Sequence, residues 1–556
     1  MNPFAKALRF WHTVRHLKPV QVYGRVRFRL ARPKPDLRPP PALRVPRGAW
    51  AQPARREPSM DSATRFRFLG EERDIDVHGW DDVSLAKLWR YNLHYFDDLT
   101  AFDARAREAW HRALITRWIT ECVPGVGTAW EPYPTALRIV NWVKWLLAGN
   151  QPVEGMLESL AVQIRFLSQR LEWHLLGNHL FVNAKALVIA GHFFEGAEGD
   201  RWRATGWSIL RNEIPEQILG DGGQFERSPM YHALAVEDML DLANTVRRFP
   251  GVSAENDVRL VHGRIGPMRV FLDAVCHPDG EVAFFNDSAV GVAPAPAELD
   301  GYAQRLGFPT GKPLETQGVQ VRPFLESGFI RVAMPGIDAL LDVGPVGPDY
   351  LPGHAHADTL SFELSINGNR VLVNSGTSQY GLGAERLRQR GTAAHNTLTV
   401  DSADSSEVWG GFRVAQRARV VVHEVSRSDA AKASVVAEHD GYRRLGHSDV
   451  HRREWEFRAD GSIKVKDCIQ SRGVAESHWH FDPAFELAVD SQGGHLVAMG
   501  RGFVIRFCAE GAVWRVSRST YHPRFGLCVP NWKAIARLTG AMATVDIEWQ
   551  PCTSSS

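Results

Sequence analysis

The sequence predicts a two-domain α+β protein in which a helical domain precedes an antiparallel β domain. A chain of 556 residues and 62.2 kDa exceeds the usual size of one hydrophobic core. Apolar residues recur at helical spacing from about residue 80 to 310, whereas alternating runs with Gly, Asn and Asp turns dominate beyond about residue 320. We therefore expect a ligand site in the concavity between the two domains.

Residues 1–79 are expected to form a basic arm and linker. Residues 1–57 hold 14 Lys and Arg against 2 Asp and Glu, a charge of +12, which leaves −10 for residues 58–556 because the whole chain carries +2. The Pro-rich segment 32–53 favours an extended connector. An amphipathic basic arm could contact an anionic membrane or glycan, but we expect its arginines to lie over the acidic body. Nucleic-acid binding is disfavoured because that body has no basic excess.

Residues 80–318 are predicted to form the helical domain. Four segments show the apolar periodicity of amphipathic helices, separated by Gly, Pro and Asn turns, and such helix pairs are compatible with a toroid of helical hairpins. These segments are residues 133–147, 154–175, 179–194 and 231–249.

Residues 319–556 are predicted to form the β domain, because short runs of period two recur through them. Within residues 359–374, Asn367, Gly368 and Asn369 predict the turn of a β-hairpin. The strand-like runs are residues 327–335, 339–345, 359–374, 395–401, 417–425, 462–470, 502–508 and 543–549.

The sequence shows no membrane span, secretory signal or cysteine framework. No run approaches the roughly 18 apolar residues of a membrane helix, so no membrane span is expected. Residues 1–20 lack the apolar core of a secretory signal, which predicts a cytoplasmic location and leaves a periplasmic one open. The six cysteines are scattered without a CxxC pair, which predicts reduced thiols.

The most informative stretch contains two histidines on either side of Ala355. In an extended chain His354 and His356 point the same way, so they could share a metal ion or work as base and ligand. His395, placed before another predicted strand, could supply a third nitrogen, and Asp358 adds a nearby carboxylate. An isolated HxH pattern is weak evidence, but this clustering favours a site.

Two stretches of the helical domain could complete that site. Asn178 and His179 stand at the predicted start of a helix, and Glu226, Arg227 and Tyr231 stand in a broken loop that leads into another. Each also has a purely structural interpretation: Asn178 as a helix cap, Tyr231 as a packed ring, and Glu226 with Arg227 as a solvated ion pair.

A third stretch, residues 127–142, is rich in aromatic and polar side chains. Trp130 and Tyr133 suit stacking on sugar rings, and the guanidinium of Arg138 suits bidentate binding of a carboxylate. Helix packing explains Trp130 equally well, whereas Arg138 is the residue that we least expect to be structural.

Together, and in this order, these motifs resemble the heparinase II/III-like polysaccharide lyases. The resemblance covers most of the chain and implies an incomplete (α/α) toroid followed by an antiparallel β-sandwich. It is carried by the motifs YNLHYFDDL (91–99), WEPYPTALRIVNW (130–142), GNHL, ERSPMYH, GHAHADTLSFEL, VNSGT and TAAHNTLTVD.

The resemblance also implies roles for single residues. Asn178 and His179 match the family's Asn-His pair, Tyr231 its catalytic tyrosine, and His354 its second catalytic histidine. The family's His/Asp/His set for zinc or another divalent ion such as manganese falls on His356, position 374 and His395. Position 374 is Asn374 here, and a neutral amide is a poorer ligand than a carboxylate, which makes the metal doubtful.

The implied reaction is β-elimination on a uronic-acid-containing polysaccharide or oligosaccharide. Asn178, helped by His179 or Arg138, would neutralise the uronate carboxylate. Tyr231 is expected to be the acid, and for one substrate epimer it could also be the base, while His354 or His179 would be the base for the other. Further substrate contacts are expected from Trp130, Tyr133, Arg138, Glu226, Tyr380 and Arg390.

Three alternatives remain open at this point. A metal-dependent hydrolase is suggested by the HAHAD pattern, but Thr359 stands where such enzymes carry another histidine. A toroid-type glycoside hydrolase could use Glu131, Glu226 and Asp221. The third is a non-catalytic glycan-binding or exopolysaccharide-biosynthesis protein on a lyase scaffold.

Overall fold

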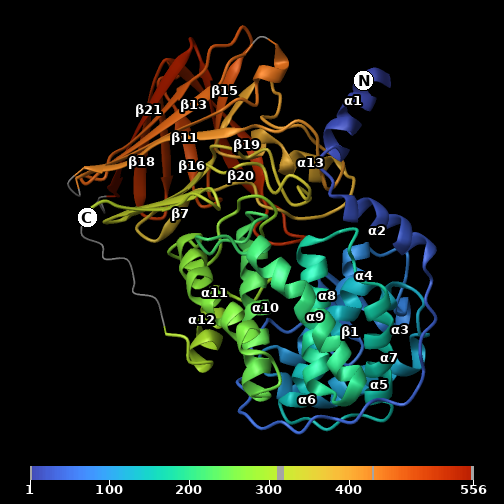
Figure 1. Ribbon diagram of the computed structural model, residues 1–556. Coiled ribbons are helices and arrows are strands. Elements are labelled where there is room, and N and C mark those ends of the chain that lie inside the picture. The colour runs from blue at the N-terminus through green and yellow to red at the C-terminus, as the bar shows by residue number, and fades with distance from the viewer. Residues whose placement is uncertain (1–2, 310–317, 429–430, 447, 553–556) are drawn as a thin grey trace.

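A computed structural model describes residues 3–309, 318–428, 431–446 and 448–552. It consists of a helical half and a β half stacked end to end, with the chain running from the first to the second (Figure 1). The last helix of the helical half ends at Arg305 and the first strand of the β half begins at Gln320. The predicted order of a helical toroid followed by an antiparallel β-sandwich is confirmed.

The N-terminal arm runs along one side of both halves (Figure 1). It comprises α1 (Pro3–Val14), α2 (Pro19–Leu30), an extended stretch, and the hairpin β1 (Arg65–Phe68) and β2 (Glu71–Asp74). Six of its cations pair with carboxylates of the body, as expected; these pairs are Arg9–Glu407, Lys18–Glu216, Arg38–Glu198, Arg44–Asp200, Arg55–Glu298 and Arg56–Glu237. Other arginines of the arm are exposed.

The toroid is organised around α8, which buries nearly all of its residues because its apolar side chains are spread around the whole helix. Helix α8 packs against α6, α9 and α10. The helices of this half are α3 (Ile75–His78), α4 (Lys87–Leu93), α5 (Glu108–Glu121), α6 (Pro132–Leu147), α7 (Met156–Gln169), α8 (Gly177–Phe193), α9 (Gly196–Gln217), α10 (Pro229–Arg248), α11 (Glu255–Ala274) and α12 (Pro296–Arg305).

The β half contains three larger antiparallel sheets around one core. A five-stranded sheet has the order β3-β4-β5-β6-β7, an eight-stranded sheet the order β11-β12-β13-β14-β21-β18-β17-β16, and a four-stranded sheet the order β19-β20-β15-β8. Their inward faces share a core cluster in which Phe362, Trp455 and Trp479 interlock edge to face.

The strands of these sheets alternate buried and exposed residues where one face meets solvent. Helix α13 (Ala384–Arg390) contacts the short hairpin formed by β9 (Val408–Trp409) and β10 (Arg413–Val414). The remaining strands are β3 (Gln320–Phe324), β4 (Phe329–Met334), β5 (Ile337–Asp342), β6 (Phe362–Ile366), β7 (Asn369–Leu372), β8 (Leu398–Val400), β11 (Val420–Ser428), β12 (Lys432–His439), β13 (His451–Arg458), β14 (Ile463–Cys468), β15 (Ala475–His480), β16 (Glu486–Val489), β17 (His495–Gly500), β18 (Phe503–Glu510), β19 (Ala512–Tyr521), β20 (Val529–Leu538) and β21 (Met542–Pro551).

Two local predictions in this half have different outcomes. The Asn367–Gly368 turn joins β6 to β7 with positive φ at both residues, which confirms the hairpin. The strand expected from Thr359 begins only at Phe362, so His354 and His356 lie in a loop. The physical reason is that the toroid binds this loop: the backbone N–H of His356 donates to the Asn286 Oδ1, and the His354 carbonyl accepts from the Asp287 N–H.

The two halves are joined by buried polar contacts. His277, which follows α11, lies 2.7 Å from the Glu363 carboxylate of β6, and neither side chain is exposed. The other oxygen of Glu363 accepts from the backbone N–H groups of Phe284 and Asn374. Such a fully bonded group fixes the toroid on the sandwich. In the part of the chain that the structure describes, no helix has the length and apolarity needed to span a bilayer.

Candidate active site

The toroid contributes the first turn of α8. Leu176 and Gly177, just before Asn178, both have positive φ, and this bend brings Asn178 and His179 to the end of the helix that faces the sandwich. The His179 ring lies 4.5 Å from that of Tyr133, and its Nδ1 is 3.1 Å from the Glu172 carboxylate. Burial alone would lower the pKa of His179, but the Glu172 carboxylate outweighs it and raises this pKa above its usual value.

Tyr231 is placed by the N-terminus of α10. Ser228 caps the helix by accepting a hydrogen bond from the Tyr231 backbone N–H. The Tyr231 phenol lies 3.1 Å from the phenol of Tyr380 and lines a small cavity of about 20 Å³ with Tyr133 and Asn178. Burial raises the pKa of Tyr231 well above its usual value, so this residue carries its proton at neutral pH.

His354 comes from the sandwich side and meets Tyr231 directly. The two ring centroids are 4.0 Å apart, and the Nδ1 of His354 lies 2.9 Å from the Asp287 Oδ2. Because a carboxylate only accepts, Nδ1 carries the hydrogen, and the Nε2 lone pair of a neutral His354 is left available. His354 is therefore arranged as a proton acceptor beside a neutral phenol.

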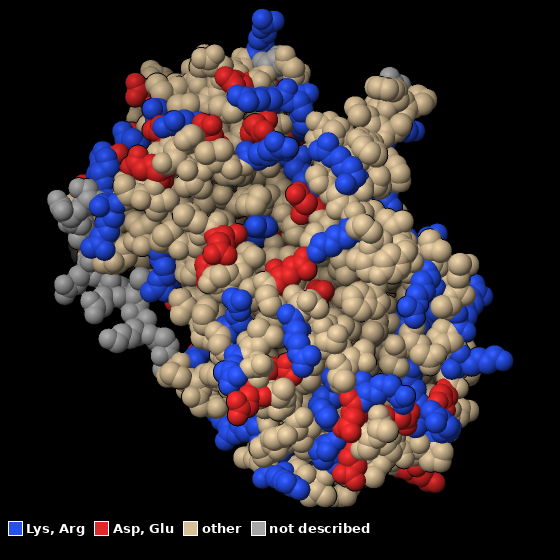
Figure 2. Space-filling model, viewed as in Figure 1, with Lys and Arg blue, Asp and Glu red and all other residues tan. Residues whose placement is uncertain are grey.

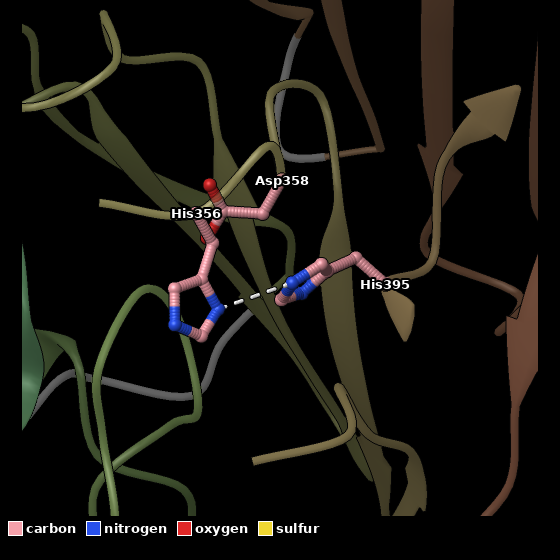
Figure 3. A group of neighbouring side chains, drawn as sticks. All are labelled: His356, Asp358 and His395. Atoms are coloured by element: carbon pink, nitrogen blue, oxygen red, sulfur yellow. Dashed lines mark hydrogen bonds between the residues drawn. The ribbon is translucent and has the colours of Figure 1, made fainter. Parts of the chain in front are cut away.

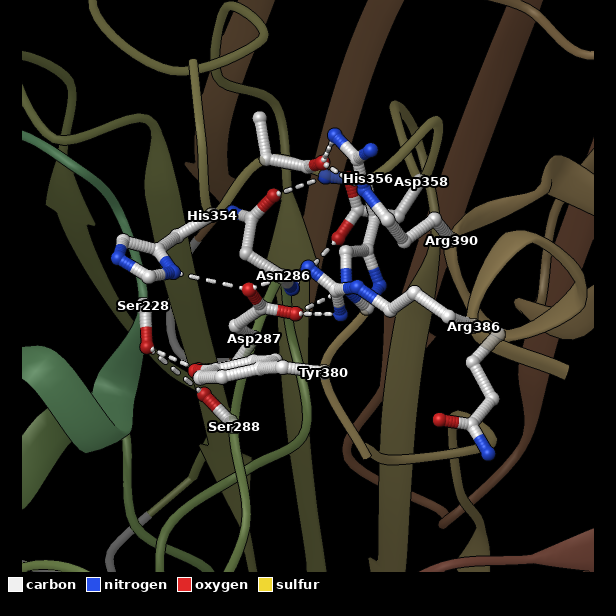
Figure 4. A network of polar contacts seen from close by, with 12 residues as sticks. Ser228, Asn286, Asp287, Ser288, His354, His356, Asp358, Tyr380, Arg386 and Arg390 are labelled. Atoms are coloured by element: carbon white, nitrogen blue, oxygen red, sulfur yellow. Dashed lines mark hydrogen bonds and ion pairs between the residues drawn. The ribbon is translucent and has the colours of Figure 1, made fainter. Parts of the chain in front are cut away.

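Asp287 is the centre of a buried network that sequence reasoning missed (Figure 4). One of its oxygens is 2.8 Å from the Nε2 of His356, and Arg386 binds both oxygens. Burial would raise the pKa of Asp287, but Arg386, His354 and His356 hold it well below its usual range. No sequence motif identifies Asp287 or Arg386 as site residues. The one available signal for Asp287 was its place in an Asn-Asp pair directly after the apolar residues 282–285.

Glu226 lies buried beside this network. Its Oε2 is 3.8 Å from the Nε2 of His354 and has no hydrogen-bond partner among the described residues. Burial raises the pKa of Glu226. Arg227, which follows it, and Asn286, which precedes Asp287, both have positive φ, and such strained positions are common at functional sites.

A second cluster behind the first could hold a metal ion (Figure 3). One donor atom each from His356, Asp358 and His395 lie within 4.8 Å of one another, and all three residues are buried. The Nδ1 of His356 faces the Nε2 of His395 at 3.2 Å. Burial lowers the pKa of His356 to about 4 and that of His395 to about 3, so both imidazoles are neutral, as metal ligands must be.

The predicted third ligand, Asn374, has a different environment. Its Oδ1 accepts a hydrogen bond from the Asn396 backbone at 3.1 Å, and its Nδ2 is buried without a partner among the described residues. The acidic member of the cluster is instead Asp358, one of whose oxygens accepts from the Asn286 N–H. Two neutral imidazoles and a carboxylate fit a divalent cation.

Besides the buried Glu226 beside His354, three predicted substrate ligands lie inside the protein instead of at the cleft. Arg138 is 0% exposed; it donates to Gln163 and to the carbonyls of His94 and Ala129, because burial requires a partner for each donor. The Arg390 guanidinium is likewise buried against the Ala355 carbonyl.

Trp130 is the third of these residues. Its ring packs against Trp118 and Phe166 in the toroid core. None of the three buried side chains can reach a substrate in this conformation, so the structure does not support the expected contacts.

Six of the predicted catalytic and substrate-binding residues meet between the two halves, where Figure 2 shows a hollow bordered by acidic and basic side chains. Asn178, His179, Tyr133 and Tyr231 come from the toroid, and His354 and Tyr380 from the loops of the sandwich. Loops and helix ends thus present the polar groups on a rigid scaffold.

Two family models match this chain. The model described as "Heparinase II/III N-terminus" matches residues 59–305, and that described as "Heparinase II/III-like, C-terminal" matches residues 316–546. The chain belongs to the heparinase II/III family. Membership confirms the resemblance inferred from the sequence motifs.

Relatives in the family carry different names. A heparin-sulfate lyase of Bacteroides stercoris is 31% identical over 249 residues, which are 41% of this chain and 36% of that protein. This chain therefore matches about a third of the length of that lyase. The FtsZ-localized protein C of Caulobacter vibrioides is 25% identical over 393 residues, or 68% of this chain and 64% of that protein.

Solved structures show the same fold. The crystal structure of heparinase III superposes with a TM-score of 0.67 over 88% of this chain and 80% of that chain, at 17% identity. The heparan sulfate lyase HepC of Pedobacter heparinus, solved as a mutant, covers 97% of this chain and 88% of its own with a TM-score of 0.58 and 18% identity.

Proposed function

We propose that this protein is a polysaccharide lyase that cleaves an acidic, uronic-acid-containing glycan by β-elimination. The observation that carries the proposal is the contact between Tyr231 of the toroid and His354 of the sandwich, with ring centroids 4.0 Å apart. One is a protonated phenol, and the other is an imidazole whose Nε2 faces the Glu226 carboxylate only at 3.8 Å, so a proton donor and a proton acceptor share one cleft.

The base in this proposal is His354. Its Nε2 removes the proton α to the uronate carboxylate, and the electron pair of that C–H bond forms the new carbon–carbon double bond. The positive charge that develops on the imidazole is stabilised by Asp287, which lies 2.9 Å from Nδ1 and stays ionised. Asp287 thus acts as a positioning residue for the base.

The acid in this proposal is Tyr231. As the bond to the 4-linked oxygen breaks, its electron pair leaves on that oxygen, and the phenol supplies the proton. The Tyr380 hydroxyl at 3.1 Å can then share the negative charge left on Tyr231 through its own hydrogen. The products are a sugar hydroxyl and an unsaturated uronate.

Neutralisation of the uronate carboxylate is assigned to Asn178 and His179. The raised pKa of His179 favours its protonated form, and its side chain is 30% exposed, so it can pair with a carboxylate. Because Arg138 is buried, the toroid offers His179 as the cation in its place. Tyr133, packed on the His179 ring, would lie against the sugar.

The buried cluster of His356, Asp358 and His395 is proposed to hold one divalent ion, zinc or manganese. When bound, the ion would supply a structural link between the loop that carries His354 and the segment before β8. His356 also bonds Asp287, so the cluster would fix the network that orients the base.

The test is a screen of uronate polysaccharides for ultraviolet absorbance of a conjugated unsaturated uronate. Heparan-type, hyaluronan- or chondroitin-type, alginate-type and bacterial exopolysaccharides are the panel, with His354→Ala as the control protein. We expect absorbance to rise with at least one substrate and only with the parent. Cleavage without new absorbance would identify a hydrolase and contradict the proposal.

A second candidate is a non-catalytic role on the same scaffold. It is favoured by a relative whose name carries no enzymatic activity, the FtsZ-localized protein C, which aligns with 68% of this chain, whereas the Bacteroides stercoris lyase aligns with 41%. Binding alone does not require a proton donor in contact with a proton acceptor, so the geometry favours the lyase. Glycan binding with no cleavage of any panel member would favour the second candidate.

A further inference from the structure

The two N-terminal helices present apolar side chains to solvent. In α1, Phe4, Leu8 and Trp11 follow one another at intervals of four and three residues, which places them on one face of the helix. All three are exposed, Phe4 to 76%, and α1 has no buried residue. Contiguous apolar exposure of this kind usually marks an interaction surface.

The opposite face of α1 attaches it to the body. Arg9 pairs with Glu407 at 2.6 Å, and the indole of Trp409 donates to the Thr13 hydroxyl at 3.0 Å. At 100° per residue, Arg9 and Thr13 lie about 140° and 180° around the helix from Phe4. The apolar face is therefore directed away from the protein, and Figure 1 shows α1 projecting at its edge.

Helix α2 repeats this arrangement. One face of α2 contacts the body through Gln21, Gly24 and Phe28. The Gln21 side chain donates to the Tyr350 carbonyl, and the Phe28 ring lies 4.2 Å from the His174 ring. Gly24 lies so close that a Cβ added to it would be 3.1 Å from the backbone nitrogen of His174. The other face carries an apolar stripe, and all of its members are exposed. The members of this stripe are Val22, Val26 and Leu30.

The basic residues around these apolar faces favour a partner with negative charge. Residues 1–35 contain nine Lys and Arg and no Asp or Glu. Exposed Arg25 and Arg29 border the α2 stripe on one side and exposed Arg27 on the other. Apolar faces flanked by cations fit the headgroup region of an anionic bilayer. A second copy of this chain would bring like charges together, which disfavours self-association through this surface.

A groove beside α2 adds a site for a headgroup. Its volume is about 300 Å³, and its walls include Tyr23, Arg27, Phe28, Arg170 and Trp173. The Arg170 guanidinium stacks 4.0 Å above the Phe28 ring. Aromatic walls with two guanidinium groups suit the boundary between lipid headgroups and chains.

We propose that α1 and α2 form an anchor that seats this protein on an anionic lipid bilayer, with the apolar faces of both helices inserted among the headgroups. The anchor is separate from the cleft chemistry. It would hold the cleft close to the bilayer, so that glycans at the membrane surface reach it first.

The experiment is flotation of the full chain with vesicles of phosphatidylcholine, either pure or containing about 30% phosphatidylglycerol. We expect binding to the anionic vesicles only, weakened by salt because exposed charges are screened. The double variant Trp11→Glu/Val26→Glu should lower the bound-to-free ratio at least tenfold. Arg25→Glu/Arg29→Glu should lower the bound-to-free ratio by a similar factor, since each basic residue near the membrane surface raises binding to anionic lipid severalfold.

The matched control is Val77→Glu/Val83→Glu, which adds the same charges at two exposed valines of the toroid surface. It should bind within about twofold of the parent, after circular dichroism shows that all variants fold. Equal binding of parent and Trp11→Glu/Val26→Glu, or no preference for anionic vesicles, would overturn the proposal. So would a dimer in sedimentation that the arm variants dissociate while vesicles bind none of the proteins.

Discussion

The rings of Tyr231 and His354 are in contact, yet their surroundings hold them differently. His354, which comes from the sandwich, bonds the fully buried Asp287 of the toroid, and Asp287 also binds Arg386 and His356. On the toroid side, Tyr231 bonds another phenol, and His179 is 30% exposed beside one carboxylate. The comparison indicates that the surroundings of His354 are preorganised, whereas Tyr231 and His179 keep polar groups free for a substrate.

Removing the Asp287 charge should have the largest effect. Asp287→Asn leaves the buried Arg386 without its counter-charge, which typically costs about 3–5 kcal/mol of unfolding free energy. We also expect kcat to fall at least about 100-fold, because the His354 base loses its orientation and charge partner. Denaturant unfolding and the absorbance assay measure the two effects.

Asp200→Asn is the matched control, since Asp200 pairs with Arg203 at 2.9 Å but is 57% exposed. An exposed pair contributes at most about 1 kcal/mol, so this variant should resemble the parent. Equal losses of unfolding free energy and of kcat in both variants would contradict the claim that the network around Asp287 orients His354.

An intermediate effect is expected at His179. If its protonated form binds the uronate carboxylate, activity is lost as pH rises through the pKa of His179, which Glu172 raises. Glu172→Gln removes that carboxylate, so the alkaline limb of kcat/KM should move to lower pH. His179→Gln should abolish this limb and raise KM about tenfold to 100-fold. An unchanged limb in both variants would contradict the assignment.

The smallest effect on catalysis is expected at Arg138. Arg138→Met removes the buried guanidinium but keeps much of its volume, so the unfolding free energy should fall by about 1–3 kcal/mol through unpaired carbonyls. The folded protein should keep the parent's kcat/KM within about twofold, measured well below the unfolding temperature. A selective rise in KM would restore Arg138 as a substrate ligand.

Much of the fold could be predicted because its signals are local. Helical spacing in residues 133–147 and the Asn367–Gly368 turn depend only on neighbouring residues. The start of β6 could not be predicted, because Asn286 and Asp287, some 70 residues earlier, bind the backbone around His354 and His356. A tertiary contact thus overrode a local preference.

The candidate site could be predicted only in part, because some of its residues stand in local motifs and others are recognised only by contacts between distant segments. Asn178, His179, Tyr231 and His354 stand in recognisable motifs, and the structure brings Tyr231 and His354 together. The burial of Arg138 could not be predicted, because its sequence neighbourhood does not reveal that Trp118 and two backbone carbonyls enclose it. Asp287 and Arg386 were missed because each becomes significant only through contacts across about 100 residues.

The central claim is that the phenol of Tyr231 and the imidazole of His354 act together on one sugar acid. The most direct measurement is the rate of unsaturated-uronate formation by Tyr231→Phe, His354→Ala and the double variant, on a substrate that the parent cleaves. We predict that each single variant loses about 100-fold or more and that the double variant is hardly slower than the worse single one. Full activity in either single variant would contradict the account.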